Sequence, residues 1–489
     1  MNLRQKIVLL AEKPSLKRAE SYIALPKIVA TKRVFKERRA RQKRKKKKMK
    51  VKIIGAGLAG CEAAYALATR GVEVDLYEMK PHRRSPAHHN DNFAELVCSN
   101  SLKAARLDSA AGLLKEEMRR LGSVCMNAAE KTSVAAGGAL AVDRDLFSGI
   151  ITKVIKNHPK INVISEEVNE INPDEITIVC SGPLTDGKLA ESIKKLTDND
   201  SLSFFDAAAP IVTAESIDMN RAFCASRYER GGDDYINCPM NKAEYEAFYE
   251  ALVSAERAPQ KEFDVNGRVY EGCMPIEVLA SRGKDTMRYG PLKPVGLTDP
   301  RTGHRPWANL QLRKENKDGT MYNLVGFQTN LKFGEQKRVF SMFPALKNAE
   351  FLRFGVMHRN TFIDSPRLLN GDFSLRSNPL LFFGGQITGV EGYMESAASG
   401  LMAGINLARR LKGEETVVLP TDTMIGALSR YISDESVKNF QPMGANFGVL
   451  PPLEEKIRDK QERYMQLAQR GMESLKEFAK NNSLCESND

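Results

Sequence analysis

A glycine-rich stretch between two short apolar runs constrains the fold of this chain more than any other feature. The first run, Val51–Ile54, leads into a turn that contains Gly55, Gly57 and Gly60 in the pattern G-x-G-x-x-G. An alanine-rich helical pattern follows, a glycine ends it, and a second strand pattern then finishes at an acidic residue, Glu78. This order of strand, turn, helix and strand is typical of the first unit of a parallel α/β sheet.

Each part of this motif suits the binding of a dinucleotide. Gly55 allows the tight turn, Gly57 lets the backbone approach a pyrophosphate, and Gly60 lets the helix pack closely on the strand. The start of the helix presents unpaired amides and a positive dipole end to phosphate, and Glu78 can accept hydrogen bonds from a ribose hydroxyl. We therefore predict a dinucleotide site formed by Gly55, Ala56, Gly57, Leu58, Ala59, Gly60 and Glu78.

A second glycine motif lies towards the other end of the chain. A buried strand is expected at Leu380–Phe383, and Gly384 and Gly385 connect it to a helix of small residues from about Met394 to Arg410. The amides at such a helix start can contact a flavin ring or a pyrophosphate. This motif is either a second, independent nucleotide site or the closing half of the first one, and closure is the arrangement common in FAD folds. The FAD contacts predicted here are Gly385, Gln386, Gly392, Tyr393 and Glu395.

The net charge of +12 is concentrated in one segment of the chain. Residues 1–50 contain 19 Lys and Arg against 3 Asp and Glu, so that residues 51–489 carry a net charge of −4. The block Arg38–Lys50 repels itself and cannot form a core. It is either a nucleic-acid-binding arm or an upstream extension without that role, with Met49 as the natural start, and we favour the extension. Any RNA-binding surface on the acidic remainder must be a local patch.

Several classes of protein are excluded by composition. No apolar run approaches the roughly 18 residues that a membrane span needs, and the first residues are too short an apolar segment for a secretion signal. Eight cysteines lie scattered without C-x-x-C spacing, so that neither a zinc site nor a secreted disulfide framework is expected. The adjacent His88 and His89 lack spaced partners, and we predict no metal site. These features favour a reducing cytoplasm.

The chain order predicts an α/β fold in which a Rossmann-type FAD-binding domain, like that of glutathione reductase, is interrupted by a smaller inserted α+β domain. The inserted segment alternates short strands with turns and carries many basic and aromatic residues. That mixture suits either contacts with phosphates and bases or an ordinary solvated sheet face. The expected parts are a basic extension at 1–48, FAD-binding segments at 49–211 and 346–435, an inserted tRNA or substrate domain at 212–345, and a C-terminal helical segment at 436–489.

Five blocks of sequence resemble one known family. They are MKVKIIGAGLAGCEAAYALA, ELVCSNSLKA, YINCPMNKAEY, FGVMHRNTFI and FFGGQITGVEGYMESAASGLMAGINLAR. Together they are similar to the folate- and FAD-dependent tRNA (uracil-5-)-methyltransferases, the TrmFO family, over roughly residues 49–435. The related GidA/MnmG flavoproteins, which modify a wobble uridine of tRNA, share the first and last blocks in looser form. Residues 1–48 depart from the family pattern.

The resemblance implies methylation of carbon 5 of a T-loop uracil in tRNA, with FAD, NAD(P)H and 5,10-methylenetetrahydrofolate as cofactors and no membrane partner. Carbon 5 of uracil becomes nucleophilic only when a thiolate adds at carbon 6. Such a site needs a thiol, a base for the carbon 5 proton and a nearby flavin. Cys98 and Cys238 match the family's two functional cysteines, and the resemblance implies that they are the catalytic thiols, in unassigned order. The polar neighbours of Cys98 and the helix start after Cys238 favour reactive thiols over buried inert ones. His358 is a candidate for stacking on flavin or pterin, against a purely structural histidine.

Two other functions are alternatives to tRNA methylation. A flavin oxidoreductase that acts on a small metabolite would share the dinucleotide motif, but its turnover would not depend on tRNA or folate. A flavin-bearing RNA-binding protein without turnover would bind tRNA and form no product. The acidic remainder of the chain argues against broad RNA affinity.

Overall fold

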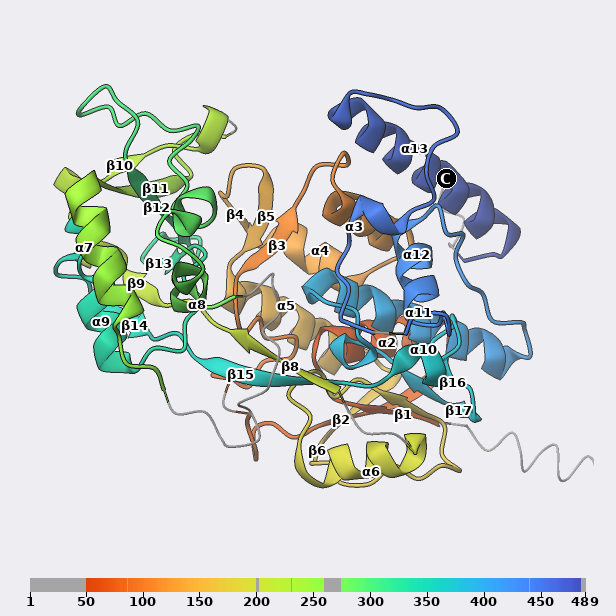
Figure 1. The fold of residues 1–489 in the computed structure, drawn as a ribbon. Coiled ribbons are helices and arrows are strands. Elements are labelled where there is room, and N and C mark those ends of the chain that lie inside the picture. The colour runs from red at the N-terminus through yellow and green to blue at the C-terminus, as the bar shows by residue number, and fades with distance from the viewer. Residues whose placement is uncertain are drawn as a thin grey trace, which may run out of the picture. The chain divides into compact units, whose positions relative to one another are not determined.

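The computed structural model of the chain describes residues 50–85, 87–198, 202–229, 231–258, 274–438 and 440–484, with the side chains of 202–207, 358 and 359 left aside. The basic extension predicted at 1–48 lies outside these residues. Lys50–Asp489 forms one compact unit. In this unit a parallel sheet covered by helices carries the glycine motifs, and a separate antiparallel sheet is inserted into it (Figure 1).

The first sheet has six strands in the order β16-β17-β7-β1-β2-β6. β1 pairs in parallel with β2 and β7, β2 with β6, and β7 with β17, and only β16 runs antiparallel to its neighbour. The predicted Rossmann-type arrangement is therefore present, with strands from both ends of the chain in one sheet. The strands are β16 (Ser374–Leu375), β17 (Asn378–Phe383), β7 (Thr177–Val179), β1 (Lys50–Ile54), β2 (Glu73–Glu78) and β6 (Ile161–Ser165).

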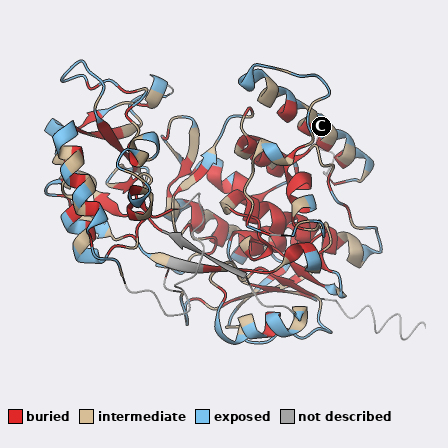
Figure 2. Ribbon diagram, in the orientation of Figure 1, coloured by how far each residue is buried: buried red, intermediate tan, exposed pale blue. Residues whose placement is uncertain are grey.

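Two helices of small residues form the centre of this domain. α2 (Leu58–Thr69) follows the first glycine turn, and α11 (Tyr393–Lys412) follows the second. A Cβ atom on Gly400 would lie 2.1 Å from the Ala59 carbonyl oxygen, and one on Gly404 would lie 2.7 Å from the Ala63 oxygen. Only residues without a side chain allow so close an approach of the two backbones, and nearly all of α11 is buried (Figure 2).

The remaining elements of this domain cover the sheet and the two central helices. A small antiparallel sheet, β3 (Ser101–Ala104), β5 (Ala139–Val142) and β4 (Ser133–Val134), lies beside them in the order β3-β5-β4. The C-terminal helix buries Leu467, Ala468 and Leu475 on one face, as expected for a packing helix. The other helices are α3 (Ala110–Arg120), α4 (Val124–Lys131), α5 (Arg144–Asn157), α6 (Gly187–Thr197), α10 (Ser365–Leu368), α12 (Met424–Tyr431) and α13 (Lys460–Asn481).

The inserted domain is built on a second six-stranded sheet in the order β10-β11-β12-β13-β9-β14. Its core contains a cluster of four phenylalanines in which the Phe248 and Phe343 ring centroids are 5.0 Å apart and those of Phe327 and Phe340 are 5.2 Å apart. The elements are β9 (Ile211–Thr213), β10 (Phe223–Cys224), β11 (Tyr235–Met240), β12 (Ala308–Lys314), β13 (Met321–Leu324), β14 (Phe351–Arg353), α7 (Lys242–Val253), α8 (Ile276–Ser281) and α9 (Phe333–Phe340).

The chain enters and leaves the inserted domain through one pair of antiparallel strands. β8 (Leu202–Ala207) leads into this domain, and β15 (Met357–Phe362) leads out of it (Figure 1). β9 and β14 are the first and last strands of this sheet along the chain, and they pair with each other. The inserted domain therefore extends from β9 to β14. Its second end is therefore Arg353, beyond the boundary predicted at 345.

Candidate active site

The first glycine turn has the geometry that a pyrophosphate requires. Gly55 has a φ of +98°, and its amide donates to the Tyr77 carbonyl oxygen at 2.8 Å. A Cβ on Gly60 would lie 1.8 Å from the Gly55 oxygen, so the turn cannot accept a side chain there. No atom lies within 4 Å of the Cβ position on Gly57. The turn is thus tight on the inside and open at Gly57, the position predicted for the close approach of a phosphate.

Glu78 fixes this turn from the end of β2. Its carboxylate is 8% exposed and accepts the amide of Ala56 at 2.8 Å and the amide of Lys80 at 3.1 Å. Each carboxylate oxygen has two acceptor sites, so the group retains capacity for a ribose hydroxyl after holding the backbone.

The second glycine motif lines the same cavity as the first. Gly385 has a φ of +91°, its amide donates to the Ser399 hydroxyl at 2.6 Å, and a Cβ at this position would lie 3.1 Å from that of Ala59. Both motifs therefore belong to one site. The predicted residues that line the cavity are Gly55, Ala56, Gly57, Leu58, Ala59, Glu78, Gly385, Gln386 and Tyr393.

Three of the predicted cofactor contacts support the cavity without lining it. Gly60 provides the close packing described above. A Cβ on Gly392 would lie 2.2 Å from a carboxylate oxygen of Glu395. Glu395 itself is 2% exposed, pairs with Lys103 at 2.7 Å and accepts the amide of Ala445 at 2.9 Å. Its role in the structure is to anchor the chain around the start of α11.

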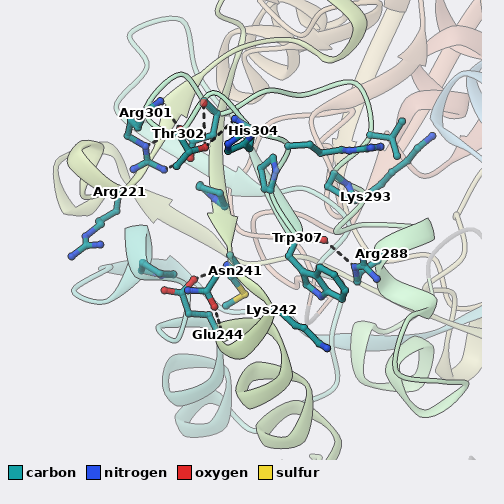
Figure 3. A pocket seen from close by; sticks show the side chains of 18 of the residues that line it. Arg221, Asn241, Lys242, Glu244, Arg288, Lys293, Arg301, Thr302, His304 and Trp307 are labelled. Atoms are coloured by element: carbon teal, nitrogen blue, oxygen red, sulfur yellow. Dashed lines mark hydrogen bonds and ion pairs between the residues drawn. The ribbon is translucent and has the colours of Figure 1, made fainter.

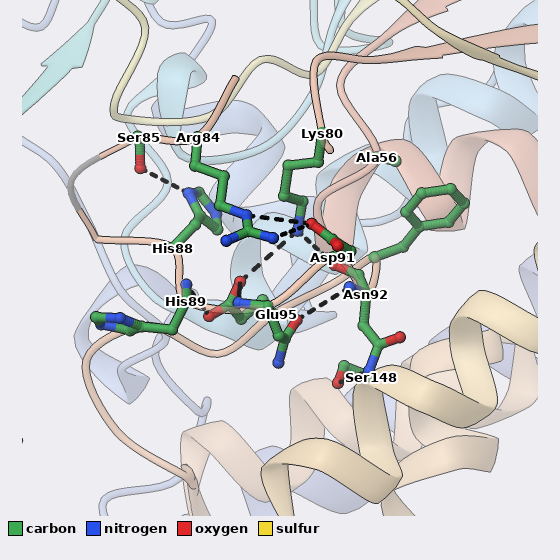
Figure 4. A network of polar contacts seen from close by, with 12 residues as sticks. Ala56, Lys80, Arg84, Ser85, His88, His89, Asp91, Asn92, Glu95 and Ser148 are labelled. Carbon is green, nitrogen blue, oxygen red and sulfur yellow. Dashed lines mark hydrogen bonds and ion pairs between the residues drawn. The ribbon is translucent and has the colours of Figure 1, made fainter. Parts of the chain in front are cut away.

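A polar network orders the loop that borders this cavity (Figure 4). Lys80 and Glu95 form a buried ion pair at 3.6 Å, and Glu95 also accepts the amide of His89 at 2.8 Å. Ser85 is hydrogen-bonded to His88 Nδ1 at 2.6 Å. Lys80, Ser85, His88 and Glu95 all line the cavity, so this loop forms part of its wall.

Cys98 is held at the edge of this cavity by Tyr393. The Tyr393 hydroxyl oxygen accepts the amide of Cys98 at 2.7 Å and the amide of Ser99 at 3.2 Å, and it lies 2.9 Å from Cys98 Sγ. Two amides occupy the acceptor side of the phenol oxygen, so its hydrogen points at the sulfur. Burial and the neighbouring Cys98 raise the pKa of Tyr393 well above its ordinary value. The phenol therefore stays protonated and can donate to a thiolate.

Three arginines surround the Cys98 loop. Arg144 donates to the Leu96 carbonyl at 2.8 Å and pairs with Glu315 at 2.7 Å. Arg313 donates to Asn100 Oδ1 and to Ser99 Oγ, each at 2.9 Å.

The third arginine, Arg353, donates to the Val97 carbonyl, and its buried Nε has no hydrogen-bond partner among the described residues. Burial and the nearby Arg144 lower the pKa of Arg353, while Tyr393, Glu315 and Cys98 act in the opposite direction. Cys98 interacts electrostatically with Arg144 and Arg353, and positive charge near a thiol stabilises its thiolate. Sequence reasoning missed this cluster because its members lie on β12, β14 and α5, far apart along the chain.

The structure places Cys238, the other predicted catalytic thiol, in the core of the inserted domain. This residue is 0% exposed and lies in β11 opposite Leu310, within the core of the inserted domain. Burial raises the pKa of its thiol, which disfavours the thiolate. Strand alternation gives the physical reason, since Ile236, Cys238 and Met240 share one face and all are buried. Its neighbours Pro239 and Met240 line a cleft of the inserted domain, whereas Cys238 itself does not.

Other sequence-based predictions fall partly outside the described residues. The backbone of His358 belongs to β15, but its side chain is not described. β15 does reach the cavity wall, because the Thr361 amide donates to the carbonyl of Pro183, which lines it. Cys273 and Cys485 also lie outside the described residues.

Metal and membrane features are lacking in the described part of the chain. No group of three or more His, Cys, Asp or Glu side chains there could hold a metal ion. None of its helices combines the length and apolar composition needed to cross a bilayer.

Comparison with known proteins identifies the family. The family model for glucose inhibited division protein A matches residues 50–415. A methylenetetrahydrofolate–tRNA-(uracil-5-)-methyltransferase TrmFO from Acetivibrio thermocellus is 59% identical over 87% of this chain and 98% of its own length. The chain belongs to the TrmFO family. TrmFO proteins from Desulfitobacterium hafniense and Listeria monocytogenes are 57% and 58% identical, each over 87% of this chain and 98% of their own length.

A solved structure agrees with the fold. GidA from Aquifex aeolicus superposes with a TM-score of 0.63 at 16% identity, covering 90% of this chain and 74% of that chain. At this identity the likeness concerns the fold alone, a Rossmann-type FAD-binding domain with an insertion. The TrmFO identity extends over almost the whole length of the relatives.

Proposed function

We infer that this protein is a methylenetetrahydrofolate-dependent tRNA (uracil-5-)-methyltransferase that uses FAD and NAD(P)H. The observation that carries this function is the 59% identity to a TrmFO protein over 98% of that relative's length. The GidA/MnmG alternative has less support, because the family model of GidA matches this chain but the solved GidA structure is only 16% identical to it, against 59% for the TrmFO protein. The tRNA substrate and the free thiols favour a cytoplasmic location.

The residues that line the cavity suit the binding of FAD. Its wall combines the open face at Gly57, the amides at the start of α2, and Gly385 from the second motif. FAD bound there would supply the redox equivalents and carry the one-carbon unit from the folate. Gly55 to Ala59 would hold its pyrophosphate, and Glu78 its ribose.

Cys98 is the thiol that the geometry favours for the reaction on uracil. A thiolate that adds to carbon 6 makes carbon 5 nucleophilic, and loss of the carbon 5 proton later releases the thiolate. Tyr393 would keep Cys98 oriented through its contact at 2.9 Å, while Arg144 and Arg353 would favour the charged sulfur. The protein's groups thus prepare the nucleophile and exclude alternative orientations.

Incubation with unmodified tRNA, NADPH and methylenetetrahydrofolate labelled in its one-carbon unit tests the function. Mass analysis of nucleosides from the tRNA should find the label in 5-methyluridine. Turnover of NADPH that is independent of tRNA and folate, without labelled product, would instead support a small-metabolite oxidoreductase. Saturable tRNA binding with no product would support the non-enzymatic alternative.

The two cysteines provide a matched pair for the site assignment. Cys98→Ser should retain bound FAD and lose nearly all methylation, because serine is a far weaker nucleophile. Cys238→Ser should retain methylation in the fraction that folds, because its side chain faces the core of the inserted domain. Bound flavin is measured by its visible absorbance, and methylation by label transfer. Full methylation by Cys98→Ser would refute the assignment.

A further inference from the structure

The inserted domain contains a large cleft that the FAD site does not use. Its volume is about 1040 Å³, and it lies between the start of α7 and the loops that precede β12 (Figure 3). The lining includes six basic side chains and two carboxylates. The basic residues are Arg221, Lys242, Arg288, Lys293, Arg301 and Arg305.

Both carboxylates that line the cleft already bind neighbouring groups of the protein. Arg301 binds both oxygens of Asp299, at 2.9 and 2.7 Å, and donates to the Asn220 carbonyl at 2.7 Å. Glu244 accepts the amide of Asn241 at 2.8 Å and closes a capping box at the start of α7. Neither acid therefore neutralises the remaining cations of the cleft.

Four of those cations have no ion-pair partner in the described part of the chain. Salt bridges within the described residues reach Arg288 and Arg301 but not Arg221, Lys242, Lys293 or Arg305. Since residues 51–489 carry a net charge of −4, this concentration of unpaired positive charge is a local exception. Such a concentration attracts a polyanion through release of its counterions.

An aromatic platform lies in the same cleft. The Arg288 guanidinium carbon is 3.8 Å from the centroid of the Trp307 ring, and Lys242 Nζ is 5.5 Å from it. Arg288 is fixed by a bond from Nε to the Trp307 carbonyl at 2.9 Å and by Asp285 at 2.8 Å. The neighbouring Tyr289 is 85% exposed, and Trp307 is 36% exposed. Flat side chains and guanidinium planes are the surfaces on which unstacked bases stack.

We propose that this cleft binds tRNA, with Lys242, Lys293 and Arg305 on phosphates and the Trp307–Tyr289 platform on an unstacked base. The proposal rests on the methyltransferase function and names the surface of the protein that holds its substrate. A negatively charged peptide, such as a polyglutamate tail on folate, would use the cations but not the exposed ring of Tyr289 or the Arg288–Trp307 stack. The combination of both features therefore favours RNA.

Trp307 is the single tryptophan of the chain, so tryptophan fluorescence reports on this cleft. Titration of the FAD-loaded protein with an unmodified tRNA transcript should quench Trp307 fluorescence in a saturable manner. Each phosphate contact contributes about 1 to the slope of log affinity against log salt concentration. Lys242→Ala combined with Arg305→Ala should therefore lower that slope by about 1.5 to 2 and weaken binding several-fold at moderate salt.

Lys337→Ala is the matched control, because this exposed lysine of α9 belongs to the same domain but does not line the cleft. Its salt slope should equal that of the wild type. Trp307→Phe retains a ring, and Trp307→Ala removes it, so that only the alanine variant should lose affinity in an electrophoretic mobility assay. Circular dichroism and flavin absorbance establish that each variant is folded.

Three outcomes separate this proposal from its alternatives. Binding of tRNA with unchanged Trp307 emission and an unchanged salt slope in the double variant would overturn it. Quenching by polyglutamylated folate that tRNA does not reverse would also overturn it, in favour of an anionic peptide. Quenching by tRNA in a protein that transfers no label would support the cleft and refute the methyltransferase function.

Discussion

Replacing Gly57 by alanine should weaken FAD binding while changing the stability of the apoprotein little. Gly57 precedes α2 with φ −71° and ψ −171°, a conformation that alanine adopts, and no atom lies within 4 Å of its Cβ position. The methyl group therefore meets nothing in the protein. It would occupy the open face through which the pyrophosphate is expected to approach.

The expected change in apoprotein stability is small because two effects offset each other. A Gly→Ala change at a compatible position stabilises a protein by about 0.4–1 kcal/mol, because it lowers the conformational entropy of the unfolded chain. Alanine is a poorer helix N-cap than glycine by a similar amount, about 0.5–1 kcal/mol. A methyl group forced against the cofactor costs about 1–3 kcal/mol, as overpacking does elsewhere. That cost corresponds to a loss of FAD affinity of roughly 5- to 150-fold.

The assay compares FAD dissociation constants, measured by flavin fluorescence, with the denaturant midpoints of the apoproteins. Gly60→Ala is the contrasting variant, because its Cβ would lie 1.8 Å from the Gly55 oxygen, and it should lower both stability and FAD affinity. Wild-type affinity for FAD in Gly57→Ala would refute the reasoning, since the open face would then not be the route of the cofactor.

Two other predictions concern Tyr393, which the sequence predicts only as an FAD contact, and Glu117, which it does not single out. Tyr393→Phe leaves the amides of Cys98 and Ser99 without their acceptor, so methylation should fall at least tenfold while FAD stays bound; unchanged label transfer would contradict this role. Burial raises the pKa of Glu117 to about 8. Its folded form therefore keeps a proton that the unfolded chain releases above about pH 4.5, and stability should fall as pH rises from 4.5 to 8. The free energy of unfolding, measured with urea at pH 5 and at pH 8, should depend less on pH in Glu117→Gln than in the wild type. An equal pH dependence in the two proteins would exclude this contribution of Glu117.

Much of the FAD-binding fold could be predicted because its signals are local. The turn at Gly55–Gly60, the helix after it and the strand that ends at Glu78 follow one another along the chain, and the structure confirms them as β1, α2 and β2. The second motif was also local, since the strand, the glycine pair and the helix of small residues follow one another, and the structure confirms them as β17 and α11. In both motifs the residues that form the turn and its flanking strand and helix are close together in the sequence.

The surroundings of the thiol could not be predicted in the same way. Arg313 and Arg353 meet the Cys98 loop only after the inserted domain has folded, and nothing local to either residue indicates that partner. Two local signals meet at Cys238: a helix start follows it, and Ile236, Cys238 and Met240 alternate along one strand face that the structure buries.

The shared cavity of Gly55 and Gly385 has a consequence for the order in which the protein matures. β1 and α2 leave the ribosome early, but β17 and α11 follow only after the entire inserted domain has been synthesised. The nascent chain therefore carries half a cofactor site through most of its synthesis. Acquisition of flavin marks a polypeptide that has reached at least α11, so yellow colour distinguishes chains that extend through α11 from chains that terminate before it.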